Sequence, residues 1–238
     1  MDLYSPIFTR RSVRNYDMEP LDEEVISEME RVLSEVQPLV PGVELTHRIA
    51  GPDEVKGLGV CKAPHYLMIS GKEQPLRNTC AGFLFQHAEL YLYSAGFATR
   101  WLNGIKPKQP DPNHIIGIAF GRPAVPATRT LAEFDRKPLE EIAQGTDERL
   151  GAVRLAPSGM NGQPWYFIVA GDMVHVYYKE SLGGMMGRFY HMTNLDVGIA
   201  LCHMAVASDH LGRRFAFTTE QSDHPQPPEG FTYIGTVG

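Results

Sequence analysis

The chain has 238 residues, of which 43% are hydrophobic and 21% charged, a composition typical of a folded protein with a sizeable core. Its formal net charge of −6 argues against a nucleic-acid-binding or membrane-surface role, because both need a basic face. Cys61, Cys80 and Cys202 are odd in number and far apart, which favours a reduced protein without a disulfide framework. No stretch is long and apolar enough to span a bilayer, and we therefore expect a cytoplasmic protein.

The first half of the chain predicts an alternation of helices and strands. Pro20 and acidic residues accompany apolar residues at helical spacing, which predicts an amphipathic helix over 19–36. A second helix, over 78–96, is apolar on nearly every side and is expected to be buried and to end at Gly96. Strands are predicted over 43–50, 64–70 and 114–121.

The second half predicts the same order of elements again. A stretch over 137–156 is similar to the first helix, and another buried helix is expected over 194–212. Strands are predicted over 163–171, 173–178 and 231–238. A repeated order of elements indicates an internal duplication, which matching residues would support.

Two blocks of residues match at nearly the same offset. The two buried helices align at an offset of 116, and residues 10–24 align with residues 128–142 at an offset of 118. The identical pairs are Asn78 and Asn194, Gly82 and Gly198, His87 and His203, and Gly96 and Gly212 in the first block, and Arg11 and Arg129, Asp17 and Asp135, Pro20 and Pro138, Leu21 and Leu139, and Glu23 and Glu141 in the second. We therefore expect two tandem degenerate repeats, 1–125 and 126–238, that form one compact intrachain pseudo-dimer.

The two copies differ at segments that are suited to bind a ligand. Arg10 and Arg14 of the first copy become Thr128 and Ala132 in the second. The second copy carries the sequence APSGMNGQPW, whereas the first has ERVLSEVQPL at the matching place. Each copy thus keeps a segment that the other has lost.

Four residues near the N-terminus form a candidate anion-binding segment: Arg10, Arg11, Ser12 and Arg14. Arginine presents a planar fork of donors that matches phosphate oxygens, and the serine hydroxyl adds another donor. Short basic runs are also common in solvated turns, so the residues alone leave both interpretations open.

A second candidate segment, 157–161, reads PSGMN. Ser158 and Asn161 have short hydrogen-bonding side chains, and Gly159 permits close approach to the backbone, which suits a loop along the edge of a planar heterocycle. A turn between a helix and a strand has a similar composition, and this alternative also stays open. Trp165, in the following strand, is expected to lie in the core rather than to bind a ligand.

Taken with the order of elements, these segments resemble the nitroreductase family of FMN-dependent oxidoreductases. The family motifs R-x-S-x-R-x-[FY] and P-S-x-x-N-x-Q-P-W are matched by Arg10, Ser12, Arg14 and Tyr16, and by Pro157, Ser158, Asn161, Gln163, Pro164 and Trp165. A helix end before Trp101 is similar as well, although Phe97 and Ala98 depart from the usual Gly-Leu-Gly. The resemblance covers nearly the whole chain and implies an α+β fold, with central antiparallel or mixed sheets flanked by helices.

The resemblance also implies one FMN site built from both repeats, because the flavin of the family's homodimers lies at the subunit interface. Arg10, Arg11 and Ser12 would hold the phosphate and ribityl chain, and Arg14 would lie near flavin N1 and the C2 carbonyl, where negative charge develops on reduction. The other implied site residues are Pro157, Ser158, Gly159, Met160 and Asn161 along the ring, and Trp101, Leu102 and Asn103, whose backbone N–H groups would lie near N5 and O4.

The implied activity is that of an enzyme which passes a hydride from NADH or NADPH through FMN to a small-molecule acceptor, such as a nitroaromatic or a quinone, by a ping-pong mechanism. The flavin carries this chemistry, so no catalytic side chain is assigned. A flavin-binding or sensory protein without turnover is an alternative, as is related flavin chemistry such as dehalogenation or ene reduction. We expect a monomeric pseudo-dimer or a weak homodimer, without nucleic-acid or membrane partners.

Two further features have structural interpretations. His87 and His203 occupy equivalent places in apolar helices and are expected to pack in the core, and since no zinc-ligand spacing is present, no metal site is expected. The glycine- and methionine-rich segment 181–192 suits either a mobile flap or a surface loop.

Overall fold

The computed structural model describes residues 1–57, 61–220 and 223–238. The chain divides into two compact units. The first unit consists of Met1–Gln37, Gly42–Arg77 and His87–Leu131, and the second of Pro38–Pro41, Asn78–Gln86 and Ala132–Gly238. No helix in the described part of the chain has the length and apolar character needed to cross a membrane.

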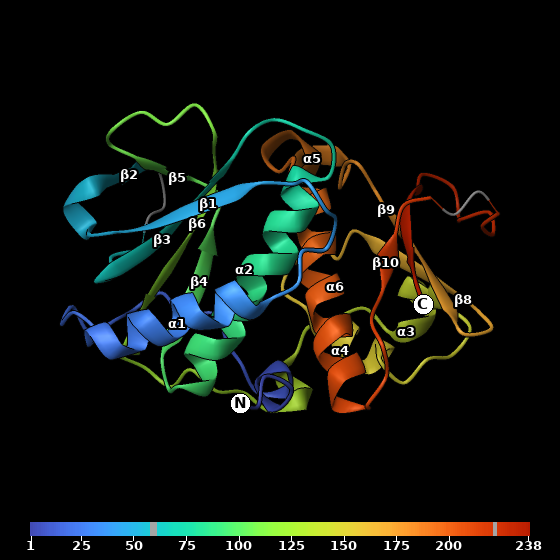
Figure 1. Ribbon diagram of the computed structural model, residues 1–238, viewed down its shortest axis with the longest axis horizontal. Helices are drawn as coiled ribbons and strands as arrows, with labels where there is room; N and C mark the ends of the chain where they lie inside the picture. The colour runs from blue at the N-terminus through green and yellow to red at the C-terminus, as the bar shows by residue number, and fades with distance from the viewer. Residues whose placement is uncertain (58–60, 221–222) are drawn as a thin grey trace. The chain divides into compact units, whose positions relative to one another are not determined.

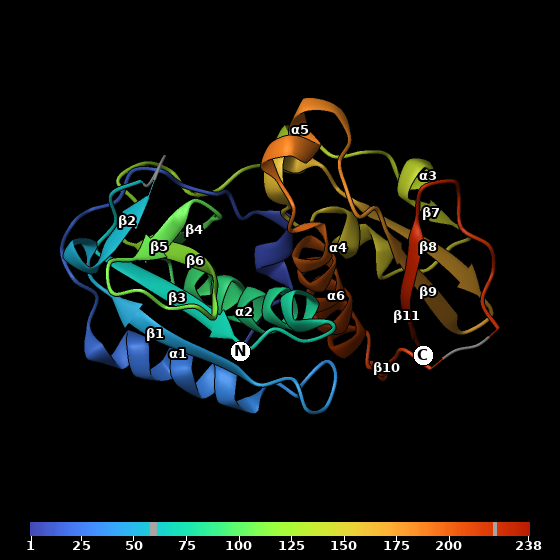
Figure 2. The same cartoon turned by 90° about the horizontal axis from the view of Figure 1, so that it is seen from above.

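The first unit is built on a four-stranded antiparallel sheet (Figure 1). Its strands, in sheet order, are β1 (Leu45–Ala50), β3 (His65–Gly71), β6 (His114–Gly121) and β4 (Ala98–Leu102). The helix α1 (Glu23–Glu35) runs beside β1 (Figure 2), and a 2.7 Å contact between the side chains of Glu30 and His47 joins the two elements. The unit also contains a ribbon of β2 (Val55–Gly57) and β5 (Ile105–Pro107) and the 3₁₀ turns η1 (Ser5–Phe8) and η2 (Pro52–Glu54).

The second unit is built on a five-stranded mixed sheet. Its strands, in sheet order, are β10 (Phe217–Thr218), β11 (Thr232–Val237), β9 (Met173–Tyr178), β8 (Trp165–Ala170) and β7 (Ala143–Gln144), and only β7 and β8 run parallel. Its helices are α3 (Leu139–Ile142), α4 (Leu150–Arg154), α5 (Gly184–Phe189) and α6 (Thr193–His210), and the 3₁₀ turns η3 (Leu131–Glu133) and η4 (Gly159–Asn161) lie at its start and before β8. The antiparallel and mixed sheets agree with the predicted fold class.

The two sheets share a topology. In each, the chain forms two neighbouring strands, then a long helix, then two more strands, and the sheet orders β1-β3-β6-β4 and β8-β9-β11-β10 correspond strand for strand. The second sheet differs by the additional edge strand β7. The long helices α2 (Arg77–Ser94) and α6 correspond as well, since each has 18 residues.

α2 and α6 end in the same way. Gly96 and Gly212 follow the two helices with φ values of 87° and 64°, a left-handed conformation that favours glycine because it has no Cβ. The predicted end of the helix at Gly96 is therefore confirmed.

Two glycines allow the start of α2 to cross α6 closely within the second unit. A Cβ atom on Gly82 would lie 2.1 Å from the carbonyl oxygen of Leu195, and one on Gly198 would lie 1.9 Å from that of Thr79. Both distances are far below a van der Waals contact, so only glycine permits this crossing. Gly82 and Gly198 are one of the pairs that match at the offset of 116.

The single helix predicted over 137–156 is wrong, because α3, β7 and α4 occupy this stretch. The chain leaves the helical path at Ala143, whose φ of −150° and ψ of 154° are extended, and Gly145 then follows with a left-handed φ of 85°. The Asp147 carboxylate then accepts a hydrogen bond from the Arg149 N–H at 2.9 Å, and this local bond competes with a continuous helix. The strands β2, β4, β5 and β10 were not predicted, since each has at most five residues and too short a pattern to identify.

The residues predicted to pack in the core do so. Trp165, His203 and His87 are 0%, 0% and 8% exposed. His203 lies with Nδ1 3.0 Å from the Ala152 carbonyl oxygen, which explains how this buried polar ring is accommodated. Among the described residues, no group of three or more His, Cys, Asp or Glu side chains is arranged to hold a metal ion.

Candidate functional site

The arginine segment 10–16 is anchored in the core of the first unit by two side chains. Val13 and Tyr16 are 3% and 7% exposed and join the hydrophobic core. The Tyr16 hydroxyl donates a hydrogen bond to the Val13 carbonyl at 3.0 Å, and burial raises the pKa of this phenol well above its usual value. Because these two side chains point inward, Arg11, Ser12 and Arg14 are left exposed.

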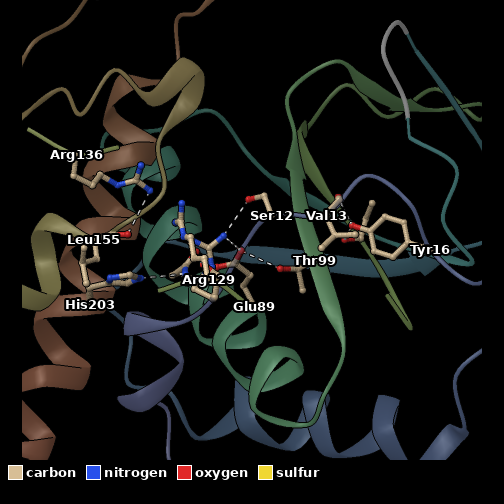
Figure 3. A network of polar contacts seen from close by, with 12 residues as sticks. Ser12, Val13, Tyr16, Glu89, Thr99, Arg129, Arg136, Leu155 and His203 are labelled. Atoms are coloured by element: carbon tan, nitrogen blue, oxygen red, sulfur yellow. Dashed lines mark hydrogen bonds and ion pairs between the residues drawn. The ribbon is translucent and has the colours of Figure 1, made fainter. Parts of the chain in front are cut away.

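Arg10 is buried, unlike the other arginines of the segment, and is 1% exposed. Its Nη2 lies 2.9 Å from Oε1 of Glu89 and 3.1 Å from the Ser12 hydroxyl, and the Thr99 hydroxyl donates to the same Glu89 oxygen at 2.9 Å (Figure 3). Its Nη1 is buried and has no hydrogen-bond partner within the described residues. A buried donor without a partner lowers the stability of a protein by about 1–3 kcal/mol.

The arginine segment pairs with its own counterpart from the later part of the first unit. The Arg11 N–H donates to the Ala127 carbonyl, and the Arg129 N–H donates to the Thr9 carbonyl, both at 2.9 Å. Arg129 also donates through Nε to the Arg10 carbonyl at 2.9 Å. Residues 9 and 127, like residues 11 and 129, are separated by the offset of 118, so the two bonds are related by a local two-fold symmetry.

A pocket of about 360 Å³ lies directly on the exposed side of the arginine segment. It is lined by Arg11, Ser12, Val13, Arg14, Asn15, Val125 and Pro126. Guanidinium groups and a hydroxyl are the donors that phosphate oxygens prefer, so the pocket is suited to an anion.

The edge strand β4 runs beside the arginine segment. The Val13 N–H donates to the Thr99 carbonyl at 3.2 Å, on the side of β4 that faces away from β6. Alternate residues of a strand direct their backbone groups to the same side, so Trp101 presents its N–H toward this edge as well. Trp101 is half-buried, Leu102 is buried, and Asn103 is exposed in the turn before β5.

β4 contributes a charged residue that the sequence analysis missed. Burial lowers the pKa of Arg100, and the nearby Arg14 lowers it further because the two guanidinium groups repel. Glu89, the buried partner of Arg10, was missed as well. It is a lone carboxylate in the otherwise apolar helix α2, and this contrast is a signal from which it could have been found.

The loop 157–163, in the second unit, is held by its own polar groups. The Ser158 hydroxyl accepts a hydrogen bond from the Gln163 N–H at 3.0 Å. The Asn161 amide donates to the Asp135 carbonyl at 2.8 Å and accepts a hydrogen bond from Arg136. The side chain of Asn161 thus stabilises the loop, whereas that of Met160 is 54% exposed.

The close approach at Gly159 is made by a side chain of the same unit. A Cβ atom on Gly159 would lie 2.0 Å from the ring of Tyr190, which explains the glycine at this position. Tyr190 is buried and follows α5, so the glycine- and methionine-rich segment 181–192 contains a short helix and contacts the 157–163 loop through this ring.

Asp196, in the first turn of α6, lies against this loop and was not predicted. It is 1% exposed, and its Oδ1 accepts hydrogen bonds from the Gly159 N–H at 3.0 Å and the Tyr190 hydroxyl at 2.7 Å. Burial raises the pKa of Asp196 to about 7. Like Glu89, it is a carboxylate in the buried part of an apolar helix.

The predicted site residues fall into two groups. Arg10, Arg11, Ser12 and Arg14 lie in the first unit together with Trp101, Leu102 and Asn103, and the bond between Val13 and Thr99 places the two segments side by side. Pro157, Ser158, Gly159, Met160 and Asn161 lie in the second unit.

The family to which the chain belongs is shown by a match to a family model. The model, described as "Putative TM nitroreductase", matches residues 2–208. The protein therefore belongs to this nitroreductase family.

The chain is also similar to solved structures. A structure described as a putative nitroreductase from Thermotoga maritima aligns with 100% of this chain and 93% of its own, with a TM-score of 0.70 and 19% identity, which shows a common fold. A nitroreductase family protein from Clostridium difficile 630 aligns with 59% of this chain and 95% of its own (TM-score 0.46, 16% identity). An FMN-dependent nitroreductase from Clostridium difficile R20291 aligns with 56% of this chain and 94% of its own (TM-score 0.43, 11% identity). Among curated proteins, no sequence matches.

Proposed function

We propose that the protein is an FMN-dependent oxidoreductase that passes electrons from NADH or NADPH to a small-molecule acceptor such as a nitroaromatic or a quinone. The observation that carries the proposal is the pocket lined by Arg11, Ser12 and Arg14, together with the unpartnered buried Nη1 of Arg10. These donors fit a phosphate, because an anion held at Ser12 offers oxygens to several of them at once.

Each residue of the arginine segment has a distinct part in this proposal. Arg10, Arg11 and Ser12 would bind the phosphate and ribityl chain, and Arg10 also orients the Ser12 hydroxyl through its 3.1 Å hydrogen bond. Arg14, with Arg100 beside it, presents positive charge to the N1 side of the flavin. FMN, when bound, supplies the two-electron transfer between nicotinamide and acceptor.

The remaining site residues would border the flavin ring. The loop residues Pro157, Ser158, Gly159, Met160 and Asn161 would form one wall through their backbone, because three of the loop's side chains are already hydrogen-bonded within the second unit. Trp101, Leu102 and Asn103 contribute backbone N–H groups from the edge of β4. No side chain is assigned as an acid or base.

The proposal includes an internal duplication, with one FMN site that takes the arginine segment from one repeat and the 157–161 loop from the other. The matching sheet orders, the two 18-residue helices and the symmetric bonds at residues 11 and 129 support the duplication. The loss of Arg10, Arg14 and the loop in opposite copies supports a single site. We further propose a cytoplasmic monomer, in keeping with three free cysteines.

FMN binding tests the proposal directly. Titration with FMN, followed by flavin fluorescence, is expected to show saturable binding that Arg11→Ala and Arg14→Ala each weaken about tenfold to a hundredfold, because a hydrogen bond to a charged group contributes about 1.5–3 kcal/mol. Arg48→Ala is a matched control, since Arg48 is an exposed arginine on β1, at the opposite edge of the same sheet from β4. A parent protein without affinity for FMN would overturn the proposal, as would equal affinities of the three variants.

Turnover separates an enzyme from a flavin-binding protein. Anaerobic addition of NADH and of NADPH to the FMN-loaded protein should bleach the flavin absorbance, and a quinone or nitroaromatic acceptor should restore it. A yellow protein that neither nicotinamide bleaches would instead support the flavin-binding or sensory alternative.

A further inference from the structure

A single buried oxygen joins three segments of the second unit. Oδ1 of Asp196, in α6, accepts hydrogen bonds from the Gly159 N–H of the 157–163 loop and from the hydroxyl of Tyr190, which follows α5. The ring of Tyr190 also packs on the loop so closely that any Cβ on Gly159 would collide with it. The loop and Tyr190 are thus joined through both a carboxyl group and a steric fit.

The loop has a backbone that needs such support. Met160, Asn161 and Gln163 have φ values of 52°, 56° and 46°, in the left-handed region that side chains disfavour. Each such residue costs roughly 1–2 kcal/mol, so the conformation persists only where surrounding contacts hold it. Asn161 holds one side of the loop through Asp135, and Gly159 holds the other through Asp196.

We propose that Asp196 is a positioning residue whose neutral carboxyl ties the 157–163 loop to Tyr190, and thereby fixes the loop backbone for ligand binding. This tie consists of the two hydrogen bonds that Oδ1 of Asp196 accepts from Gly159 and Tyr190, and its existence is independent of the proposed function. The effect on ligand binding rests on that function, in which this loop borders the flavin.

The neutral form follows from the surroundings of the carboxyl group. Oδ2 of Asp196 is buried and has no hydrogen-bond partner within the described residues, so an ionised carboxylate would place charge on an oxygen without a donor. A proton on Oδ2 removes this cost and leaves Oδ1 able to accept both hydrogen bonds. Burial raises the pKa of Asp196 to about 7, although the Gly159 N–H and the Tyr190 hydroxyl, the groups that face it from the loop and from the segment before α6, lower it.

The strength of the tie depends on pH in a defined direction. An Asp196 released to solvent ionises near the ordinary aspartate pKa of about 3.9, so between that value and about pH 7 opening of the tie releases a proton. The tie is therefore strongest in acid, weakens as the pH rises toward 7, and is independent of pH above the pKa of the folded state.

Amide hydrogen exchange at Gly159 in flavin-free protein tests the tie. The protection factor is expected to fall by up to about tenfold per pH unit between about pH 5 and pH 7, and to level off above. Asp196→Asn, which keeps an acceptor at Oδ1 but does not titrate, should retain protection without this pH dependence. Tyr190→Phe should lower protection at every pH, while Asp209→Asn, an exposed carboxylate later in α6, should behave as the parent.

The outcomes separate the tie from the proposed function. A pH dependence that persists in Asp196→Asn would overturn the neutral tie, and protection unchanged in Tyr190→Phe would show that the two segments are not joined. With FMN, Asp196→Ala should bind about tenfold more weakly and Asp196→Asn should restore binding to within about twofold of the parent. A parent that fails to bind FMN leaves the exchange result standing, whereas unchanged FMN affinity in Asp196→Ala overturns the positioning role.

Discussion

At the scale of single residues, each unit has a buried carboxyl group beside its candidate ligand-binding segment, and the two groups are accommodated in opposite ways. Glu89 forms an ion pair with Arg10 at 2.9 Å, and the side chains of Glu89 and Arg10 are 0% and 1% exposed. Asp196 has no cationic partner among the described residues, and burial raises its pKa. A carboxyl group at the same degree of burial is therefore either ionised and paired or protonated, depending on whether a guanidinium lies beside it.

Glu89→Gln is expected to destabilise the protein, because it removes the partner of the buried Arg10 side chain. The change removes the balancing carboxylate, and because breaking a buried ion pair leaves one charge uncompensated, the free energy of unfolding should fall by about 3 kcal/mol in urea denaturation. The phosphate of FMN would restore negative charge near Arg10, so FMN should stabilise this variant more than the parent. Glu35→Gln, which removes an exposed partner of Arg31, should change little. Equal losses of unfolding free energy in Glu89→Gln and Glu35→Gln would contradict the buried ion pair.

At the scale of elements, the crossing of α2 and α6 depends on glycine at the points of closest approach. Neither helix has one apolar face, and both are buried nearly all round, so the sequence predicts the two helices from their apolar character but has no periodicity that would show which faces meet. The contact is decided by Gly82 and Gly198, where the backbone of the partner helix occupies the place of a side chain.

Gly82→Ala and Gly198→Ala should each destabilise the protein. The added methyl group would overlap a backbone carbonyl, and relief requires the helices to move apart, at a cost of about 1–3 kcal/mol or more in the free energy of unfolding. Gly151→Ala is the matched control in α4, where nothing lies within 4 Å of the new Cβ and alanine favours a helix by about 0.5–1 kcal/mol. Chemical denaturation measures the free energy of unfolding of each variant. Equal values for Gly82→Ala and Gly151→Ala would disprove the close crossing.

At the scale of the whole molecule, the proposed duplication predicts an assembly state and a stoichiometry. The family resemblance implies a flavin at the interface of two chains, and under the proposed duplication a chain that carries both repeats would need no second copy. We expect a monomer that binds one FMN per chain, measured by light scattering and flavin absorbance on the same sample. Two FMN per chain would show that the second site is intact, and a stable dimer would show that the fused repeats do not suffice.

The sequence by itself predicted the long helices, the longer strands and the glycine at the end of α2, and it singled out the arginine segment as a candidate anion-binding segment. These features depend on neighbouring residues, such as the apolar period of α1 and the left-handed glycine that follows α2. The identical residues that match between the two halves of the chain were likewise found from the sequence alone.

Only the tertiary structure decided which polar groups form ion pairs and hydrogen bonds with each other. Arg10 meets Glu89, and Gly159 meets Asp196 across 37 positions of the chain, and no local pattern encodes either contact. The same absence of local information explains why the helix over 137–156 was mispredicted, since β7 forms by pairing with β8 rather than by its own propensity. Burial, and with it the raised pKa of Asp196, arises only when distant segments exclude water together.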